Sequence, residues 1–141
     1  KLTRCIPGGE YSYEAGYRAG LEIAQGEPTD AVFFANDILA AGGFDALKET
    51  LGLSIPDDIA IAGFDDVALT RWPHYSLTTF RQPVDAMVEL TVQLITQQLA
   101  RSSLPPTQNS LSGELIVRHS TAGHQAVETI DATGLPLPSG K

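Results

Sequence analysis

Two aspartates, Asp65 and Asp66, follow directly after an apolar run that spans residues 59–64. Paired carboxylates can serve as an acid–base pair, as half of a metal site, as a helix cap or as hydrogen-bond acceptors for a hydroxylated ligand. Because neighbouring side chains at a strand end diverge, we expect these two carboxyl groups to point apart rather than to share a proton. Other residues must decide between the remaining roles.

An amide, Asn36, follows a second apolar run, residues 31–35. Ligands of open parallel sheets bind beyond the carboxyl ends of the strands, so we expect Asn36 and Asp65 to approach each other there. Tyr11, in the turn before the first predicted helix, can reach the same edge. An aromatic ring, an amide and a carboxylate together suit a polyol, because the ring covers C–H groups while the polar groups bind hydroxyls. Asn36 equally suits a turn, Asp66 a cap or a loop, and Tyr11 simple packing.

Catalytic and metal-binding roles find less support. The candidate metal ligands His74, His119, His124 and Cys5 lack the spacing of a metal site. The nucleophile-elbow and phosphate-binding glycine motifs do not occur in the sequence. We therefore expect neither an enzyme nor a cofactor, and a sugar-modifying enzyme that uses Asp65 is a weaker alternative.

The apolar runs predict the elements that position these residues. Residues 31–35 and 59–64 are typical of buried strands, the first covered on both faces, and a helix between them makes a βαβ unit with a right-handed crossover. The fold class is therefore α/β, with a parallel, doubly wound sheet. Shorter strands are expected at 2–6 and 114–117, and residues 67–79 are expected to be irregular.

Three helices are predicted from caps and apolar periodicity. The first follows a Ser12 cap and ends near Gly26, and the second follows an Asp37 cap and ends near Thr50. The third begins at Pro83 and carries an apolar stripe to about Ala100.

Composition limits the class of protein. The chain has 141 residues, 43% of them hydrophobic, which fits one globular domain. No apolar stretch is long enough for a membrane span. The net charge of −8 disfavours direct contact with nucleic acid. The single Cys5 mildly favours a reducing compartment, and a start at Lys1 suggests a piece of a longer protein.

An ordered series of motifs resembles one protein family. The motifs are A-N-D at 35–37, I-P-D-D-I at 55–59, G-F-D-D at 63–66, L-T-T-x-x-Q-P at 77–83 and R-x-S-T at 118–121. From about Gly9 to Thr121 the chain is similar to the effector-binding core of LacI/GalR transcription regulators. The resemblance implies that residues 1–121 form the second lobe of a periplasmic-binding-protein-like domain. Residues 77–108 would cross towards a first lobe, and 122–141 would be a flexible tail.

The resemblance also implies a function. Members of the family are cytoplasmic homodimers, or dimers of dimers, that bind a small metabolite, commonly a sugar, and contact DNA through an N-terminal helix-turn-helix domain that this sequence lacks. The implied effector contacts are Tyr11, Asn36, Asp65 and Val84. The implied dimer contacts are Ala40, Ala41, Phe44 and Trp72, although the first three equally suit packing on the lobe's own sheet. A periplasmic sugar-binding protein of a transport system is the main alternative.

The apolar stripe of the third helix would face the first lobe in a complete protein. Without that lobe, we expect the stripe to find another partner by swapping, by folding back or by self-association.

Overall fold

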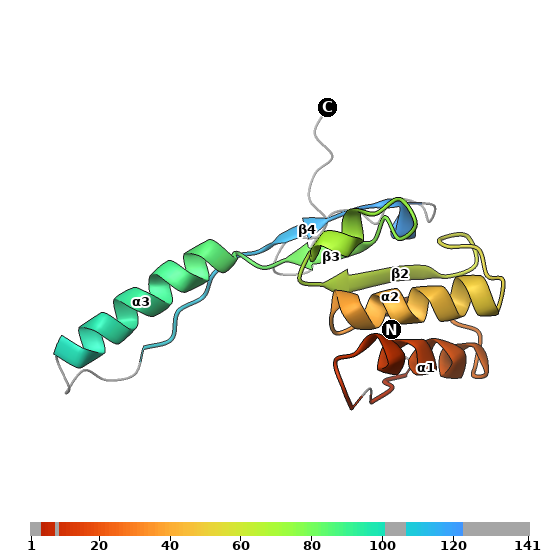
Figure 1. Ribbon diagram of the computed structural model, residues 1–141, viewed down its shortest axis with the longest axis horizontal. Helices are drawn as coiled ribbons and strands as arrows, with labels where there is room; N and C mark the ends of the chain where they lie inside the picture. The colour runs from red at the N-terminus through yellow and green to blue at the C-terminus, as the bar shows by residue number, and fades with distance from the viewer. Residues whose placement is uncertain (1–3, 8, 101–106, 123–141) are drawn as a thin grey trace.

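The computed structural model describes residues 4–7, 9–100 and 107–122 (Figure 1). Residues 13–24, 37–50 and 84–100 are helical, and four strands form one sheet. In chain order the elements are α1 (Tyr13–Ala24), β1 (Ala31–Phe33), α2 (Asp37–Asp45), a π-helical turn (Ala46–Thr50), β2 (Ala60–Phe64), a 3-10 turn (Ala68–Arg71), β3 (Thr78–Arg81), α3 (Val84–Ala100), β4 (Glu114–Ile116) and a 3-10 turn (His119–Thr121). The predicted tail, 122–141, lies outside the described residues except for Ala122.

The sheet has the order β1-β2-β3-β4. The first three strands are parallel, with Ala31 beside Ala60 and Ala62 beside Thr78. Strand β4 runs antiparallel to β3, with Arg81 beside Glu114. The α/β class with a mainly parallel sheet is confirmed. Strand β3 falls partly in the segment expected to be irregular, since its threonines give no apolar run.

Helix α2 packs on one side of this sheet, and α1 packs against α2 (Figure 1). Ser12 caps α1 as predicted, since its Oγ accepts a hydrogen bond from the N–H of Ala15 at 3.2 Å. Glycines permit the close approach of α1 and α2, because a methyl group on Gly42 would overlap the backbone carbonyl oxygen of Tyr13. The contact therefore depends on backbone atoms, which cannot move aside.

The cap of α2 differs from the prediction. Asn36, not Asp37, is the capping residue, and its Oδ1 accepts from the N–H of Leu39 at 2.9 Å. Asp37 is the first helical residue and is fully buried. Its carboxylate has other partners, described below.

The core lies between α2 and the sheet. Its largest fully buried apolar side chains are Leu47, Ile61 and Leu77, packed with Phe34 and Phe44. Burial of one such side chain contributes roughly 1.5–3 kcal/mol to stability. The core thus fixes the strands whose carboxyl ends carry Asn36 and Asp65.

The expectation that residues 31–35 are covered on both faces is wrong for the described part of the chain. Phe34 is buried, but Phe33 is 63% exposed and Ala31 and Ala35 are exposed too. Residues 4–7 do not form a strand beside β1, and the start of the predicted strand 2–6 lies outside the described residues. Among the described residues, no strand pairs with the other edge of β1.

Helix α3 projects away from the sheet as an arm (Figure 1). It has 17 residues and none of them is buried. Its exposed apolar side chains are Val84, Met87, Val88, Val92, Ile95 and Leu99. Across the described residues, the search for a helix suited to crossing a bilayer found none.

Candidate functional site

Asn36 and Asp65 lie at the same edge of the sheet. Phe33 of β1 pairs in register with Ala62 of β2. Asn36 is the third residue after Phe33, and Asp65 is the third residue after Ala62. The helix cap uses the amide oxygen of Asn36, so its NH₂ group is the part free to bind a ligand.

The loop that carries Asp65 has an unusual backbone. Asp65 has φ 116° and Asp66 has φ 56°, in the left-handed region that favours glycine. Two neighbouring non-glycine residues in this region are strained, and such strain persists only where the surroundings impose it. The loop geometry therefore needs a structural cause.

Three hydrogen bonds to two elements, β3 and α2, fix this backbone. The N–H of Asp65 donates to the carbonyl oxygen of Phe80 at 2.9 Å, and the N–H of Asp66 donates to Oγ1 of Thr79 at 3.3 Å. The N–H of Val67 donates to Oδ2 of Asp37 at 3.0 Å. With three successive N–H groups bound, the loop is held against β3 and the start of α2.

The carboxylate of Asp65 opens onto a cavity of about 490 Å³. Gln82 donates a hydrogen bond to Asp65 Oδ1 and lines the same cavity, as does Val84 at the start of α3. Asn36 and Tyr11 do not line it. Tyr11 is 73% exposed beside the first turn of α1. The structure thus brings Asp65 and Val84 to one cavity, with Asn36 at the same sheet edge.

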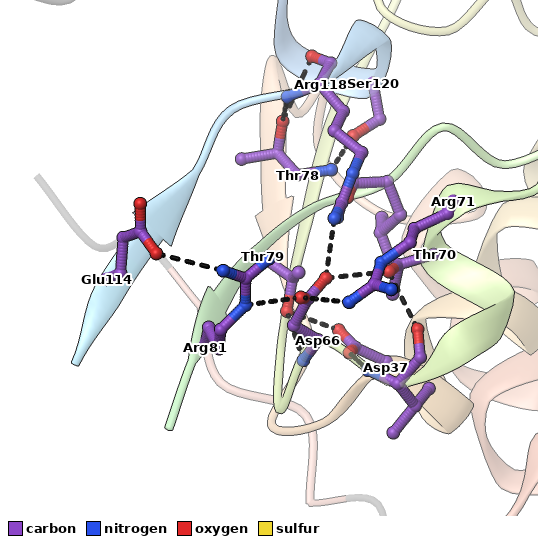
Figure 2. A network of polar contacts seen from close by, with 12 residues as sticks. Asp37, Asp66, Thr70, Arg71, Thr78, Thr79, Arg81, Glu114, Arg118 and Ser120 are labelled. Carbon is purple, nitrogen blue, oxygen red and sulfur yellow. Dashed lines mark hydrogen bonds and ion pairs between the residues drawn. The ribbon is translucent and has the colours of Figure 1, made fainter. Parts of the chain in front are cut away.

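Asp66 lines the same cavity, together with Arg71 and Arg81, and is the centre of a polar network (Figure 2). Its Oδ1 accepts from Arg118 Nη2 at 2.6 Å and from Thr70 Oγ1 at 3.0 Å. Its Oδ2 accepts from Arg81 Nε at 2.7 Å and from Arg71 Nη2 at 3.0 Å. The two adjacent carboxylates therefore have different hydrogen-bond partners, since Asp65 binds Gln82 and none of the donors of Asp66.

Electrostatics keep Asp66 ionised. Burial alone would raise the pKa of its carboxyl group, whose side chain is only 1% exposed. Hydrogen bonds from Arg118, Arg81 and Arg71 outweigh burial and hold this pKa well below its usual range. A carboxylate so placed is fixed in charge and in position at neutral pH.

The network extends along β3 and β4 (Figure 2). Arg81 Nη1 reaches Glu114 Oε2 at 3.0 Å, and Arg118 Nη1 donates to the carbonyl oxygen of Leu77 at 2.7 Å. Ser120 Oγ donates to the carbonyl oxygen of Ile61 and accepts from the N–H of Thr78. These contacts join the L-T-T motif to the R-x-S-T motif, since Leu77 binds Arg118 and Thr78 binds Ser120.

Sequence reasoning missed the arginines of this network. Arg71, Arg81 and Arg118 lie 5, 15 and 52 positions after Asp66. Only Arg118 carried a signal, as the first residue of R-x-S-T. The alternative in which Asp66 orders its loop agrees with the contacts.

Asp37 is a second buried carboxyl group beside the loop. Its Oδ1 accepts from Thr79 Oγ1 at 2.6 Å, in addition to the Val67 contact of Oδ2. Burial raises its pKa, and the hydrogen bonds from Thr79 and Val67 oppose that shift in part. Asp37 thus joins α2 to the loop that carries Asp65 and Asp66.

The residues implied in a dimer interface divide into two groups. Ala40, Ala41 and Phe44 are at most 3% exposed and pack inside the lobe. Packing within the lobe, the alternative for these three, is what the structure has. Trp72 is 59% exposed and stacks beside Tyr75, so it alone offers a large apolar surface to a partner.

His74 contacts a carboxylate and is not part of a cluster of potential metal ligands among the described residues. Its Nε2 lies 2.8 Å from Asp45 Oδ1, and the hydroxyl groups of Tyr13 and Tyr75 donate to Asp45 Oδ2. The Asp45 hydrogen bond, together with burial, raises the pKa of Tyr13 to about 12. Within the described ranges, no group of three or more potential ligands could hold a metal ion.

A second, apolar cavity of about 440 Å³ lies between α3 and the segment that returns to β4. The stacked rings of Phe64 and Phe80, 5.3 Å apart, line its sheet end, and Met87 and Leu94 line its helix side. It contains no ionisable side chain, so it differs in kind from the Asp65 cavity.

Comparison with known families shows which proteins this chain is related to. Residues 3–121 match the family model described as a periplasmic binding protein-like domain. The chain belongs to this family. The resemblance predicted from the motifs is confirmed, because proteins similar to this chain include LacI-family transcription regulators.

One curated relative is the HTH-type transcriptional regulator MalR of Streptomyces coelicolor, 35% identical over 112 residues. The match covers 79% of this chain but 32% of the relative, so the chain spans about a third of the length of that protein.

Two solved structures are similar throughout most of the chain. One is a LacI-family transcriptional regulator from Sanguibacter keddieii, with 32% identity, a TM-score of 0.77 and coverage of 84% of this chain and 44% of that one. The other is a LacI-family regulator from Enterococcus faecalis with bound ribose, with 34% identity, a TM-score of 0.70 and coverage of 79% and 41%.

Proposed function

We propose that this chain is the second lobe of the effector-sensing core of a LacI-type transcription regulator. In this proposal the complete protein binds a small sugar between two lobes and couples binding to DNA contact by a helix-turn-helix domain. The similarity to regulators, rather than to transport proteins, supports this reading over a periplasmic sugar-binding protein.

The observation that carries the proposal is the position of Asp65. Its carboxylate lies at the carboxyl end of a central strand and opens onto a cavity of about 490 Å³. A carboxylate accepts hydrogen bonds from two neighbouring hydroxyl groups, which is the arrangement that a sugar ring presents. The bound ribose in a relative of 34% identity agrees with this ligand class.

The other effector contacts are assigned by their places around Asp65. Asn36 at the same edge donates through its NH₂ group, Val84 covers an apolar part of the ligand, and Tyr11 stacks on its C–H face. Gln82 already binds Asp65, so a ligand hydroxyl would share or replace that contact.

Regulation follows from differential binding. A ligand that contacts both lobes favours the lobe arrangement to which it binds more tightly, and the population shifts towards it. A coupling of about 1–3 kcal/mol between effector and DNA sites changes DNA affinity roughly 5- to 150-fold. The proposal includes a cytoplasmic homodimer in which Trp72 contributes to the interface.

Calorimetric titration of the complete protein with ribose, sucrose and lactose tests the ligand assignment. We expect at least one sugar to bind, and Asp65→Ala to weaken it at least tenfold. Asp57→Ala is the matched control, because Asp57 is exposed in the loop before β2, at the opposite end of that strand from Asp65. Equal affinity of the Asp65 variant and the parent would contradict the site.

A gel-shift assay on the protein's own upstream DNA tests regulation. The parent should change its DNA affinity when the sugar is added, whereas Asp65→Ala should bind DNA with no response. A signal peptide upstream, in place of a helix-turn-helix, would instead support the transport alternative. Turnover of the sugar would support an enzyme.

A further inference from the structure

We infer that Asp66 is a positioning residue that fixes the arm α3 relative to the loop carrying Asp65. The inference deepens the proposed function and rests on it for its consequence, because it names the part of the lobe that transmits ligand binding. Its evidence is the geometry of the network around Asp66.

Asp66 joins three separate parts of the chain (Figure 2). Thr70 and Arg71 approach from the 3-10 turn, Arg81 from the last position of β3, and Arg118 from the segment after β4. Both carboxylate oxygens have two donors each, so the acceptor capacity of the group is well used. A displacement of any one part must disturb the others.

Strands β3 and β4 are the two attachments of the arm. Arg81 ends β3, and Val84 begins α3 only three positions later. Glu114 begins β4 and pairs in register with Arg81, to which it is also joined by an ion pair of 3.0 Å. The base of the arm is therefore closed by the same guanidinium that binds Asp66.

Burial of Asp66 favours one arrangement of β3 and β4, the one in which the arginines reach its carboxylate. The Asp66 side chain is 1% exposed and Arg118 14% exposed, whereas Arg71 and Arg81 are 61% and 43% exposed. A buried carboxylate without its partners is strongly unfavourable. The strands are thus held where all three arginines reach it, rather than over a range of angles.

The junction is adjacent to the proposed ligand contact. Asp65 precedes Asp66 in a loop whose N–H groups are bound to Phe80, Thr79 and Asp37. Gln82, between β3 and α3, donates to Asp65. A ligand that displaces Asp65 therefore displaces the base of the arm as well, through the contacts of Asp66 and Gln82.

Pulsed electron–electron double resonance, which measures distances between two nitroxide labels, tests the inference on the 141-residue protein without any ligand. The parent carries Cys5→Ser, with nitroxides on Asp57→Cys in the lobe and Gln97→Cys on α3, all three positions being exposed. Labelled protein is diluted into excess unlabelled protein so that only distances within one chain are measured. We expect Asp66→Asn to widen the lobe-to-arm distance distribution at least twofold, with unchanged far-ultraviolet circular dichroism.

Arg81→Gln is the second variant. It removes the β3 contact and the Glu114 pair while Arg71 and Arg118 still bind Asp66, so the chain should fold and the distribution should widen. Arg4→Gln, which breaks an exposed ion pair with Glu22 on α1, is the matched control and should leave the width unchanged.

The outcomes separate a positioning role of Asp66 from a role in stability alone. A stabilising role alone would lower the melting temperature of Asp66→Asn without widening the distribution of the folded protein, and this would overturn the inference. If Asp66→Asn does not fold, an unchanged width in Arg81→Gln overturns it. Failure to bind sugars would contradict the proposed function but leave this measurement intact.

Discussion

The hydroxyl group of Thr79 links Asp37 to Asp66. It donates to Asp37 Oδ1 at 2.6 Å, and the same oxygen accepts from the backbone N–H of Asp66 at 3.3 Å. One fully buried threonine on β3 therefore connects the start of α2 with the loop after β2. The start of α2, the loop after β2 and strand β3 meet at this oxygen atom, which makes Thr79 a direct target for substitution.

Thr79→Val should destabilise the protein by about 1–3 kcal/mol, because a buried acceptor and a buried donor each lose a partner while the side-chain shape is kept. Urea unfolding followed by circular dichroism measures the change. Thr96→Val is the matched control, since Thr96 is exposed on α3 and binds only the carbonyl oxygen of Val92. An equal effect of the two substitutions would show that the link contributes nothing.

Asp66→Asn should lower the free energy of unfolding by about 3 kcal/mol at neutral pH, the lower end for breaking a buried ion pair, because two of its arginines are largely exposed. The pKa of Asp66 in the folded protein lies below the value of about 3.9 in an unfolded chain. Its contribution is therefore fully present above about pH 4 and is lost as the pH falls through the folded-state pKa.

Unfolding experiments from neutral to acidic pH check this dependence. The difference between the parent and Asp66→Asn should stay constant down to about pH 4 and shrink below it. A difference that grows on acidification would mean that the carboxyl group is protonated in the folded protein at neutral pH.

Gly42→Ala should destabilise the protein by about 3 kcal/mol, the upper end for overpacking, because the added methyl group meets the backbone carbonyl of Tyr13 in α1. Gly26→Ala is the matched control. There the methyl group meets the end of the flexible Arg4 side chain, which can move away. Thermal unfolding of both variants compares the two, and similar melting temperatures would contradict the close helix contact.

The chain should self-associate through α3. Val84, Val88, Val92, Ile95 and Leu99 repeat at intervals of four and three residues, and each is more than half exposed. Such spacing forms a seam that a second helix can pack against. Light scattering should give a mass that rises with concentration, and Val88→Lys with Ile95→Lys should restore the monomer.

Gln93→Lys, at an exposed polar position of the same helix, should leave the association of the parent unchanged. A parent that remains monomeric at high concentration would remove this prediction.

Local signals predicted much of the fold. The apolar runs before Asn36 and Asp65 gave two neighbouring parallel strands, and the residue type of Ser12 gave the first cap. The shared sheet edge of Asn36 and Asp65 followed from the rule that parallel strands end together. These features depend on residues close in sequence or on a general topological rule.

The polar interior was not predictable in the same way. Strand β3 begins with two buried threonines, Thr78 and Thr79, whose hydroxyl groups are paired with Asp37, Arg118 and Thr121, so polar residues occupy core positions. The cap of α2 moved from Asp37 to Asn36 because Asp37 binds Thr79, on a strand 42 positions later. Such contacts between distant residues leave no periodic trace in a single sequence.

The backbone at Asp65 restricts how the binding preference of this lobe can evolve or be redesigned. At φ 116° the position tolerates glycine, asparagine or aspartate far better than branched or bulky residues. Under the proposed function, retuning towards a different metabolite would therefore have little choice of residue at Asp65 and would act mainly at Val84 or Gln82. Their repertoire is wider because neither is among the positive-φ residues of the described chain.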